Sequence, residues 1–550
     1  MVKHKHTNPI RLNDGMTIGS LAAETDDDYL FDCFVHYPPV EIAMKVDSHG
    51  SILTGRTGAG KTAIIRYIES RAEHSVQIRP SDMAMSYVSN SDALLFLHAI
   101  GADLDLLFQA LWKHVICIEF IRLRWAVTDS EKSRSIFSRI TEKFSRDQRK
   151  EKALRYLRDW EGEFWITMDE NIKTITERVE KKVEAELGGE IRKWKARGQY
   201  DKQLSVDKKT DLVRRVRSII SGEQLSELSG VIDILSEFDA YEQGNQSKYY
   251  LLIDKLDENW VDTSVRFRLI RALIETVKTF RRIRHLKVLV AMRSDILERV
   301  VQETKDISYQ REKSEEYFVK IKWNRAQLKS LADSRILKMY RRQYTAQDVH
   351  FEDLFPYQVG RADAIDYIID HTLMRPRDVI AFVNECLRAA DGTLEVTATN
   401  VRRAEVEYSR LRREALEHEW QSAFPTLKLL LDFIAEGRKE AFQIGEMTVG
   451  PRLEQLGLNI AAEPRIDFDP THAAATAYCE TPSEKAFLFA KEVVSILYRV
   501  GAVGLKLDPA DRFRYSHLDE PIISIALIPD EAKVRVHPML HAALKINLGQ

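Results

Sequence analysis

The sequence predicts an α/β fold built around a parallel β-sheet, and three features support that prediction. Short apolar runs, such as residues 250–253 and 287–292, are typical of strands buried on both faces. Segments with apolar residues at helical spacing separate these runs. Only 23 of the 550 residues are glycine and 15 are proline, which indicates much helix and few long linkers.

The composition is that of an ordinary globular protein, with 44% hydrophobic and 30% charged residues. A net charge of -2 excludes a globally basic nucleic-acid coat but leaves room for a local basic patch. The four cysteines show no CxxC spacing, so we expect reduced thiols in a cytoplasmic protein. The N-terminus has no apolar signal segment, and no run reaches the roughly 18 apolar residues that span a bilayer, so we expect no membrane partner.

The first predicted strand leads into a glycine-rich turn and then into a helix. The spacing Gly55-x-x-x-x-Gly60-Lys61-Thr62 is the P-loop pattern. Glycines let the backbone curl so that its N–H groups point at phosphate oxygens. Lys61 supplies charge to the β and γ phosphates, and the Thr62 hydroxyl is placed to ligate Mg²⁺. We therefore expect ATP to contact the whole turn, which comprises Gly55, Arg56, Thr57, Gly58, Ala59, Gly60, Lys61 and Thr62.

An acidic residue follows the second buried run. The sequence Leu-Leu-Ile-Asp254 has the Walker B form, in which the carboxylate holds Mg²⁺ directly or through water, beside Thr62. Lys255 follows this aspartate directly, and two further acids, Asp257 and Glu258, come shortly after it.

Two arginine groups are further candidates for contact with the γ-phosphate. Arg293 ends the strand at 287–292, where it either touches the γ-phosphate or pairs structurally with an acid. The basic turn formed by Arg281, Arg282 and Arg284 is predicted near the nucleotide-facing half of the sheet, without obvious local acids. It is either a finger that reaches a neighbouring subunit or a solvated turn.

The rest of the chain suggests five regions: a lead-in at 1–48, the core at 49–127 and 223–323, a helical insertion at 128–222, a helical lid at 324–423 and a small domain at 424–550. In the lid, Pro376 and Asp378 suit a helix start. Arg375 or Arg377 beside it is predicted to contact the γ-phosphate, the alternative being an interface ion pair.

The last region has the order of a winged helix, with three helices followed by a hairpin at 503–507 and 512–516. Its third helix, residues 483–500, carries Lys485, Lys491 and Arg499 together with Glu484 and Glu492. DNA contact through this helix is one interpretation. A regulatory or interaction module is the other.

Together these motifs resemble the AAA+/STAND side of the P-loop ATPases, with a layout similar to the Orc/Cdc6-like initiators. The phrases LLIDKLDE and RPRDVI look more like a bacterial family of stand-alone P-loop ATPases found among genome-defence genes. The resemblance implies an ATP-binding and ATP-hydrolysing switch in antiviral defence that forms homo-oligomers and signals to an effector protein. Typical AAA+ proteins place a catalytic glutamate directly after the Walker B aspartate, whereas this chain has Lys255 there. By this resemblance the carboxylate that activates water is Asp257 or Glu258, and slow hydrolysis is expected. The alternative is a DNA-bound initiator or loader ATPase, and a P-loop kinase is less expected because no acceptor-site motif is evident.

Overall fold

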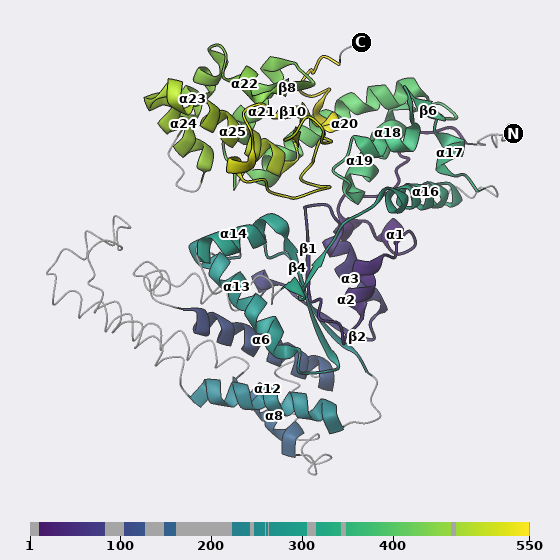
Figure 1. Cartoon of the computed structure of the whole chain (residues 1–550). Coiled ribbons are helices and arrows are strands. Elements are labelled where there is room, and N and C mark those ends of the chain that lie inside the picture. The colour runs from purple at the N-terminus through teal and green to yellow at the C-terminus, as the bar shows by residue number, and fades with distance from the viewer. Residues whose placement is uncertain are drawn as a thin grey trace. The chain divides into compact units, whose positions relative to one another are not determined.

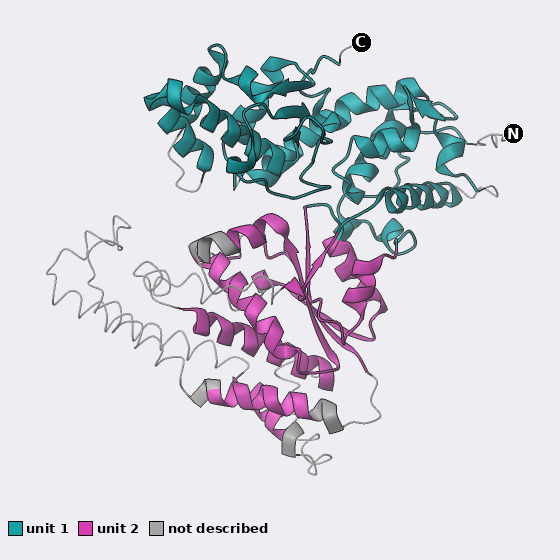
Figure 2. Cartoon of the chain, in the orientation of Figure 1, with its two compact units in different colours: residues 1–35, 57–60, 322–550 teal, residues 36–56, 61–321 magenta. Residues whose placement is uncertain are grey.

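The computed structural model describes residues 10–82, 104–126, 148–160, 223–241, 247–258, 260–261, 263–304, 315–342, 348–421, 423–463 and 469–548. The chain divides into two compact units (Figure 2). Unit 1 contains residues 1–35, 57–60 and 322–550, and unit 2 contains residues 36–56 and 61–321. Most of the predicted insertion at 128–222 lies outside the described residues.

Unit 2 is built on a five-stranded sheet in which every pairing is parallel (Figure 1). The strand order is β2-β3-β4-β1-β5. Every residue of β1 and β3 is buried, as expected for strands covered on both faces. The α/β class with a parallel sheet is therefore confirmed. The strands are β1 (Ile52–Gly55), β2 (His74–Ile78), β3 (Tyr249–Ile253), β4 (Leu286–Arg293) and β5 (Phe318–Lys320).

The register of the sheet brings the carboxyl ends of three strands together. Gly55 at the end of β1 pairs with Arg293 at the end of β4, and Ile253 at the end of β3 pairs with Val290. Since β4 separates β1 from β3, the residues that follow these strands emerge at one edge. This is the edge at which open α/β sheets bind ligands.

The basic turn lies at the opposite edge, so its predicted position near the nucleotide-facing half is wrong. Arg281, Arg282 and Arg284 precede the first residue of β4, which is eight residues long. At about 3.3 Å per residue, the strand places them roughly 25 Å from its carboxyl end. Acids are also present, since Arg282 forms an ion pair with Asp233 at 2.6 Å.

Helices cover the sheet of unit 2, and two of them form its main helical contact. The α6 and α13 helices pack together, and the Trp112 Nε1–H group of α6 donates to the Leu269 carbonyl of α13 at 2.9 Å. No described helix has the length and apolarity that a membrane crossing requires. The helices are α2 (Pro38–Met44), α3 (Lys61–Arg71), α6 (Asp105–Trp125), α8 (Gln148–Trp160), α12 (Glu223–Tyr241), α13 (Thr263–Phe280) and α14 (Ser294–Thr304), with the short η2 (Pro80–Asp82).

Unit 1 is largely helical, and most of its elements before residue 420 are helices of the region expected to form the helical lid. Asn324 caps α16 through a reciprocal pair of bonds with Gln327, and Thr397 caps α20 in the same way with Asn400. The elements up to residue 420 are η1 (Ala23–Thr25), α1 (Asp27–Leu30), α16 (Arg325–Arg341), α17 (Phe351–Leu354), β6 (Gln358–Val359), β7 (Ala362–Asp363), α18 (Ala364–Asp370), α19 (Pro376–Ala389) and α20 (Ala398–Trp420).

The remainder of unit 1 combines helices with a small antiparallel sheet of order β8-β10-β9. Its buried side chains belong to the same hydrophobic core as those of the preceding helices. Ser409 of α20 donates to the Met539 carbonyl at 2.6 Å, which ties the two regions together. The elements are α21 (Leu427–Gly437), β8 (Ala441–Gln443), α22 (Ile444–Met447), α23 (Arg452–Ala462), α24 (Pro470–Glu480), α25 (Pro482–Val500), β9 (Val503–Lys506), η3 (Ile525–Leu527), β10 (Lys533–Val536) and η4 (Pro538–Leu540).

The predicted hairpin at 503–507 and 512–516 is wrong in its second strand. Residue Leu505 makes a single bridge to Arg514, whereas the whole of β9 pairs with β10. The strand that pairs with β9 is therefore β10, which lies later in the chain than the predicted second strand at 512–516. The sequence analysis also missed α24, which precedes the long α25 helix.

Candidate functional site

The glycine-rich loop joins β1 to α3, so the predicted strand–turn–helix order is observed. Gly58 has φ +78° and Gly60 has φ +96°, values in the left-handed region that side chains disfavour. A Cβ atom on Gly58 would also lie 2.9 Å from the Cβ of Arg377. Glycine is therefore required at this position for both backbone and steric reasons.

The ammonium group of Lys61 folds back onto the loop. Its Nζ donates to the carbonyls of Gly55 and Arg56, each at 3.0 Å. Burial lowers the pKa of Lys61 to about 8, and the neighbouring Asp254 carboxylate partly opposes this shift. Among the described residues, the lysine is thus a buried cation whose hydrogen bonds go to neutral carbonyl groups, and an incoming anion would be a stronger partner.

Asp254 lies directly after β3 and is 6% exposed. Its Oδ1 accepts the Lys255 backbone N–H at 2.8 Å, while its buried Oδ2 makes no hydrogen bond with any residue that the structure describes. Burial raises the pKa of Asp254, and the Lys255 amide, the Thr62 hydroxyl and Lys61 oppose the rise. An unsatisfied buried carboxylate oxygen beside a hydroxyl suits a cation, so these two residues fit the predicted Mg²⁺ ligands.

The described residues include no cluster of three or more His, Cys, Asp or Glu side chains arranged to hold a metal. A divalent ion at Thr62 and Asp254 would depend on water and phosphate oxygens for its other ligands. Magnesium is commonly bound in this way, with one or two carboxylates and the substrate phosphates.

Lys255 adopts the left-handed conformation, with φ +63°. This geometry directs its amide to Asp254, and its Nζ lies 3.2 Å from a carboxylate oxygen of Glu258. Strained backbone of this kind tends to cluster at functional sites. The position that carries a catalytic glutamate in the resembled family is here occupied by a strained cation that pairs with one of the two candidate acids.

Arg293 is held by two acids at the end of β4. Its Nε and Nη2 atoms donate to Asp295 at 3.0 and 2.8 Å, and its Nη1 lies 3.4 Å from Asp257. The structural pairing considered for Arg293 is thus present, and the role of Asp295 was missed. Asp257 and Glu258 are both exposed, so both can be reached by water.

Arg375 is buried and its guanidinium group is almost fully engaged. It makes four hydrogen bonds: two to Asp378 at 2.8 and 3.1 Å, one to Glu419 at 3.1 Å and one to the Thr57 carbonyl at 2.8 Å. Burial opposes its charge, but Asp378 and Glu419 outweigh that effect and raise the pKa of Arg375. The guanidinium has five N–H groups, so little capacity is left for a phosphate.

Arg377 is the less constrained member of the pair. It packs against Gly58, and its Nε donates to the Leu21 carbonyl at 3.1 Å. Burial, with the nearby Arg375, lowers the pKa of Arg377. Its terminal nitrogens make no hydrogen bond with the described residues, so Arg377 has the free donors that a phosphate contact requires.

The basic side chains of α25 do not form a basic face. Lys491 pairs with Asp530 at 2.6 Å, and the guanidinium of Arg499 lies 5.3 Å from the centre of the Phe424 ring. The helix also contributes eight buried residues to the core. The structure therefore gives the predicted DNA contact through this helix no support.

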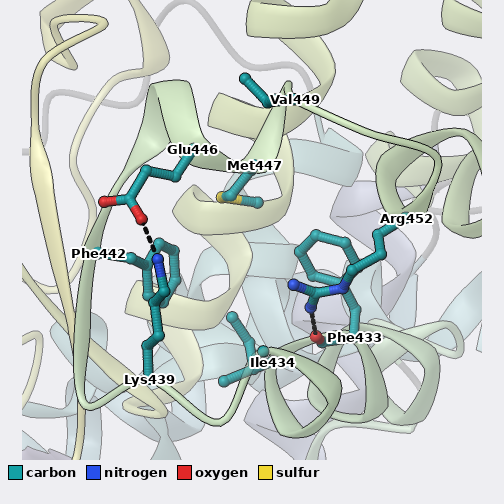
Figure 3. Close-up of a pocket in the computed structure, with 9 residues that line it drawn as sticks. Phe433, Ile434, Lys439, Phe442, Glu446, Met447, Val449 and Arg452 are labelled. Carbon is teal, nitrogen blue, oxygen red and sulfur yellow. Dashed lines mark hydrogen bonds and ion pairs between the residues drawn. The ribbon is translucent and has the colours of Figure 1, made fainter.

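A pocket away from the glycine-rich loop lies among α21, β8, α22 and α23 (Figure 3). Its lining is mainly apolar, with Arg452 donating to the Phe433 carbonyl at 2.5 Å and Lys439 paired with Glu446. None of the predicted site residues contributes to it.

A family model described as "FunZ-associated C-terminal helical domain" matches residues 326–417. The matched range extends from α16 to α20. It covers only part of the chain and contains Arg375 and Arg377 but neither Lys61 nor Asp254. No curated protein matches the chain. Beside this helical domain, the parallel five-stranded sheet of unit 2 fits an α/β nucleotide-binding core.

Proposed function

We propose that the protein binds ATP with Mg²⁺ at residues 55–62, hydrolyses it slowly and acts as a nucleotide-dependent switch. The observation that carries this proposal is the buried, unsatisfied Oδ2 of Asp254 near both Thr62 and Lys61, at the carboxyl edge of a parallel sheet. This arrangement leaves a buried charge incompletely satisfied where a phosphate and a cation would complete it.

Each residue near the loop has a role in this proposal. The loop amides and the start of α3 bind phosphate oxygens, because these N–H groups have no partner within the helix. Lys61 leaves the Gly55 and Arg56 carbonyls to bind the β and γ phosphates. Thr62 and Asp254 hold Mg²⁺, which would neutralise charge on the phosphates. Arg377 is the proposed phosphate contact of the pair, in preference to Arg375.

Slow turnover follows from the residues that come after Asp254. Asp257 and Glu258 each form an ion pair, with Arg293 and Lys255 respectively. Asp257 is the stronger candidate for orienting water, because its partner Arg293 ends β4 beside Gly55 of the loop. The Arg293 guanidinium, whose Nη1 lies 3.4 Å from the Asp257 carboxylate, would help to orient that carboxylate. Because Lys255 stands where the resembled family has a catalytic glutamate, hydrolysis is expected to be slow.

Calorimetric titration with Mg²⁺ and a non-hydrolysable ATP analogue tests nucleotide binding. Lys61→Ala removes a charge-assisted contact and should weaken binding about 10- to 100-fold. Lys287→Met is a matched control, because Lys287 is also buried and its pKa is also lowered to about 8, but it lies at the amino end of β4 and donates to the Ser48 carbonyl. Equal affinities for wild type and Lys61→Ala would contradict the proposal.

The switch is proposed to work by ATP-dependent homo-oligomerisation that signals to an effector protein in antiviral defence. The resemblance of the motifs and the match to a FunZ-associated helical domain support this proposal. Light scattering with and without the analogue tests it, and a protein that stays monomeric at micromolar concentration would refute assembly. Arg281→Ala, Arg282→Ala and Arg284→Ala then test a finger supplied in trans, and Arg293 is the next candidate.

A further inference from the structure

We propose that Trp323 and Arg375 are positioning residues that hold the glycine-rich loop by its carbonyl groups. This leaves the loop amides free to bind phosphate. The inference rests on the proposed nucleotide binding and adds two residues, neither of which would touch the nucleotide. The loop tip, residues 57–60, groups with unit 1, to which both side chains belong.

Trp323 contacts the loop through a single donor. Its Nε1–H group donates to the Ala59 carbonyl at 2.9 Å, and its ring carbon Cζ2 lies 3.8 Å from the point where a Cβ on Gly60 would stand. The indole nitrogen is a donor only, so it can hold a carbonyl but cannot compete for an amide. Trp323 directly precedes Asn324, which caps α16, and it packs against the hydrophobic core.

Arg375 holds the loop from a second point. Its Nη1 donates to the Thr57 carbonyl at 2.8 Å. Asp378 orients the guanidinium from one side and also accepts a bond from Arg412 at 2.9 Å. Glu419 accepts a further hydrogen bond from Arg375 Nη1 at 3.1 Å. Because α19 and α20 both contribute to this network, the donor that faces Thr57 is held rigidly.

The carbonyl bonds matter because a phosphate-binding loop must turn its N–H groups inward. Four carbonyls of the loop are occupied: those of Gly55 and Arg56 by Lys61, that of Thr57 by Arg375 and that of Ala59 by Trp323. When Lys61 moves to a phosphate, its two bonds are lost and those from Arg375 and Trp323 remain. A loop already held in the binding geometry loses less conformational entropy when the ligand arrives.

Trp323→Phe is the sharpest test, because it removes the N–H donor and keeps an aromatic ring. Trp420→Phe is its matched control, since Trp420 is buried in unit 1 and stacks on Phe424 without contacting the loop. Arg375→Lys is a second variant, which retains the charge but loses the fork of donors. Affinity for the Mg²⁺-bound, non-hydrolysable ATP analogue is measured well below the unfolding temperature of each protein.

We expect Trp323→Phe and Arg375→Lys to bind the analogue about three- to tenfold more weakly, as for the loss of one hydrogen bond. Trp420→Phe should bind like wild type even where its unfolding midpoint falls, a pattern that a purely structural effect would not produce. Wild-type affinity in Trp323→Phe would overturn the inference, as would equal losses in Trp323→Phe and Trp420→Phe.

A second readout needs no nucleotide. Arg56 is a trypsin site at the start of the loop tip, and cleavage after it requires the loop to open. We expect cleavage there to be about three- to tenfold faster in Trp323→Phe than in wild type or Trp420→Phe. Unchanged cleavage would contradict the positioning role. If wild type binds no nucleotide while the cleavage contrast holds, the proposed function fails but the positioning of the loop stands.

Discussion

The two units each bury a cluster of charged side chains, and the clusters differ in how completely those charges are paired. In unit 1, Asp378 is bound by Arg375, by Arg412 and by the Leu373 amide. In unit 2, Asp254 has one bonded oxygen and one buried oxygen without a partner. Buried charges are costly unless they are satisfied. The first cluster is therefore a structural brace, and the second is a site that a ligand would complete.

The pKa shifts follow the same division. Burial alone would raise the pKa of Asp378, but its two arginine partners hold the value far below the ordinary range. The pKa of Asp254 is raised, because burial outweighs its neighbours. Lys61, next to Asp254, is correspondingly shifted down to about 8. Shifts driven by desolvation beside incomplete partners are a recurrent property of functional sites.

The largest expected effect is on hydrolysis, at the exposed acids of the unit 2 cluster. Losing the residue that orients water should lower turnover roughly 10²- to 10⁴-fold. Steady-state hydrolysis by Asp257→Asn and Glu258→Gln measures this, and we expect the larger loss for Asp257→Asn. Asp233→Asn, which loses an exposed acid paired with Arg282, is the control. Wild-type turnover in both variants would show that neither acid acts on water.

Removing the central acid of each cluster tests directly whether the two clusters contribute differently to stability. Asp378→Ala leaves two buried arginines without their shared partner and should lower the free energy of unfolding by about 3–5 kcal/mol. Asp254→Asn removes an incompletely paired charge and should change it by less than about 1 kcal/mol, while weakening Mg²⁺-dependent nucleotide binding. Denaturant unfolding compares the two. Similar destabilisation by both substitutions would mean that the clusters are not different in kind.

The pH dependence of nucleotide affinity tests whether Lys61, in the unit 2 cluster, binds phosphate as a cation. Its pKa is lowered to about 8, so the ammonium form that attracts phosphate is present below pH 8 and is lost as the pH rises through it. Between pH 7.5 and 9.5 the protonated fraction falls about 25-fold, so the affinity should fall by up to about that factor. Lys61→Ala should show a flat profile over that range. A flat wild-type profile would mean that Lys61 does not contribute as a cation.

The smallest expected effect concerns backbone strain beside Asp254. Lys255 has φ +63°, which costs about 1 kcal/mol for a residue with a Cβ atom. Lys255→Ala and Lys255→Gly both remove the pairing with Glu258, but only glycine relieves the strain. We therefore expect Lys255→Gly to be about 1 kcal/mol more stable than Lys255→Ala. If the alanine variant is as stable as the glycine variant, the backbone at Lys255 is not strained.

The sequence alone determined the local parts of this protein. Strands covered on both faces are continuous apolar runs, so residues 250–253 were recognisable as a strand and Asp254 as the acid that follows it. The same local logic placed Pro376 at the start of α19, because proline suits the first turn of a helix. In each case the interactions that form the element lie within a few residues of one another.

Tertiary structure decided which distant groups meet. The sequence proposed Arg375 and Arg377 as equivalents, but only the packing of α20 brings Glu419 and Arg412 to the network around Arg375. The hairpin prediction was only partly right for the same reason: Leu505 makes one antiparallel bridge to Arg514, whereas the strand that pairs with the whole of β9 is the later β10. The basic turn was predicted at the wrong edge of the sheet. It precedes β4, so the direction of that strand places the turn at the edge opposite the carboxyl ends of the strands. Trp323 carries no motif, and only the folded chain brings its indole to Ala59, since hydrogen bonds between distant residues leave no periodic pattern in the sequence.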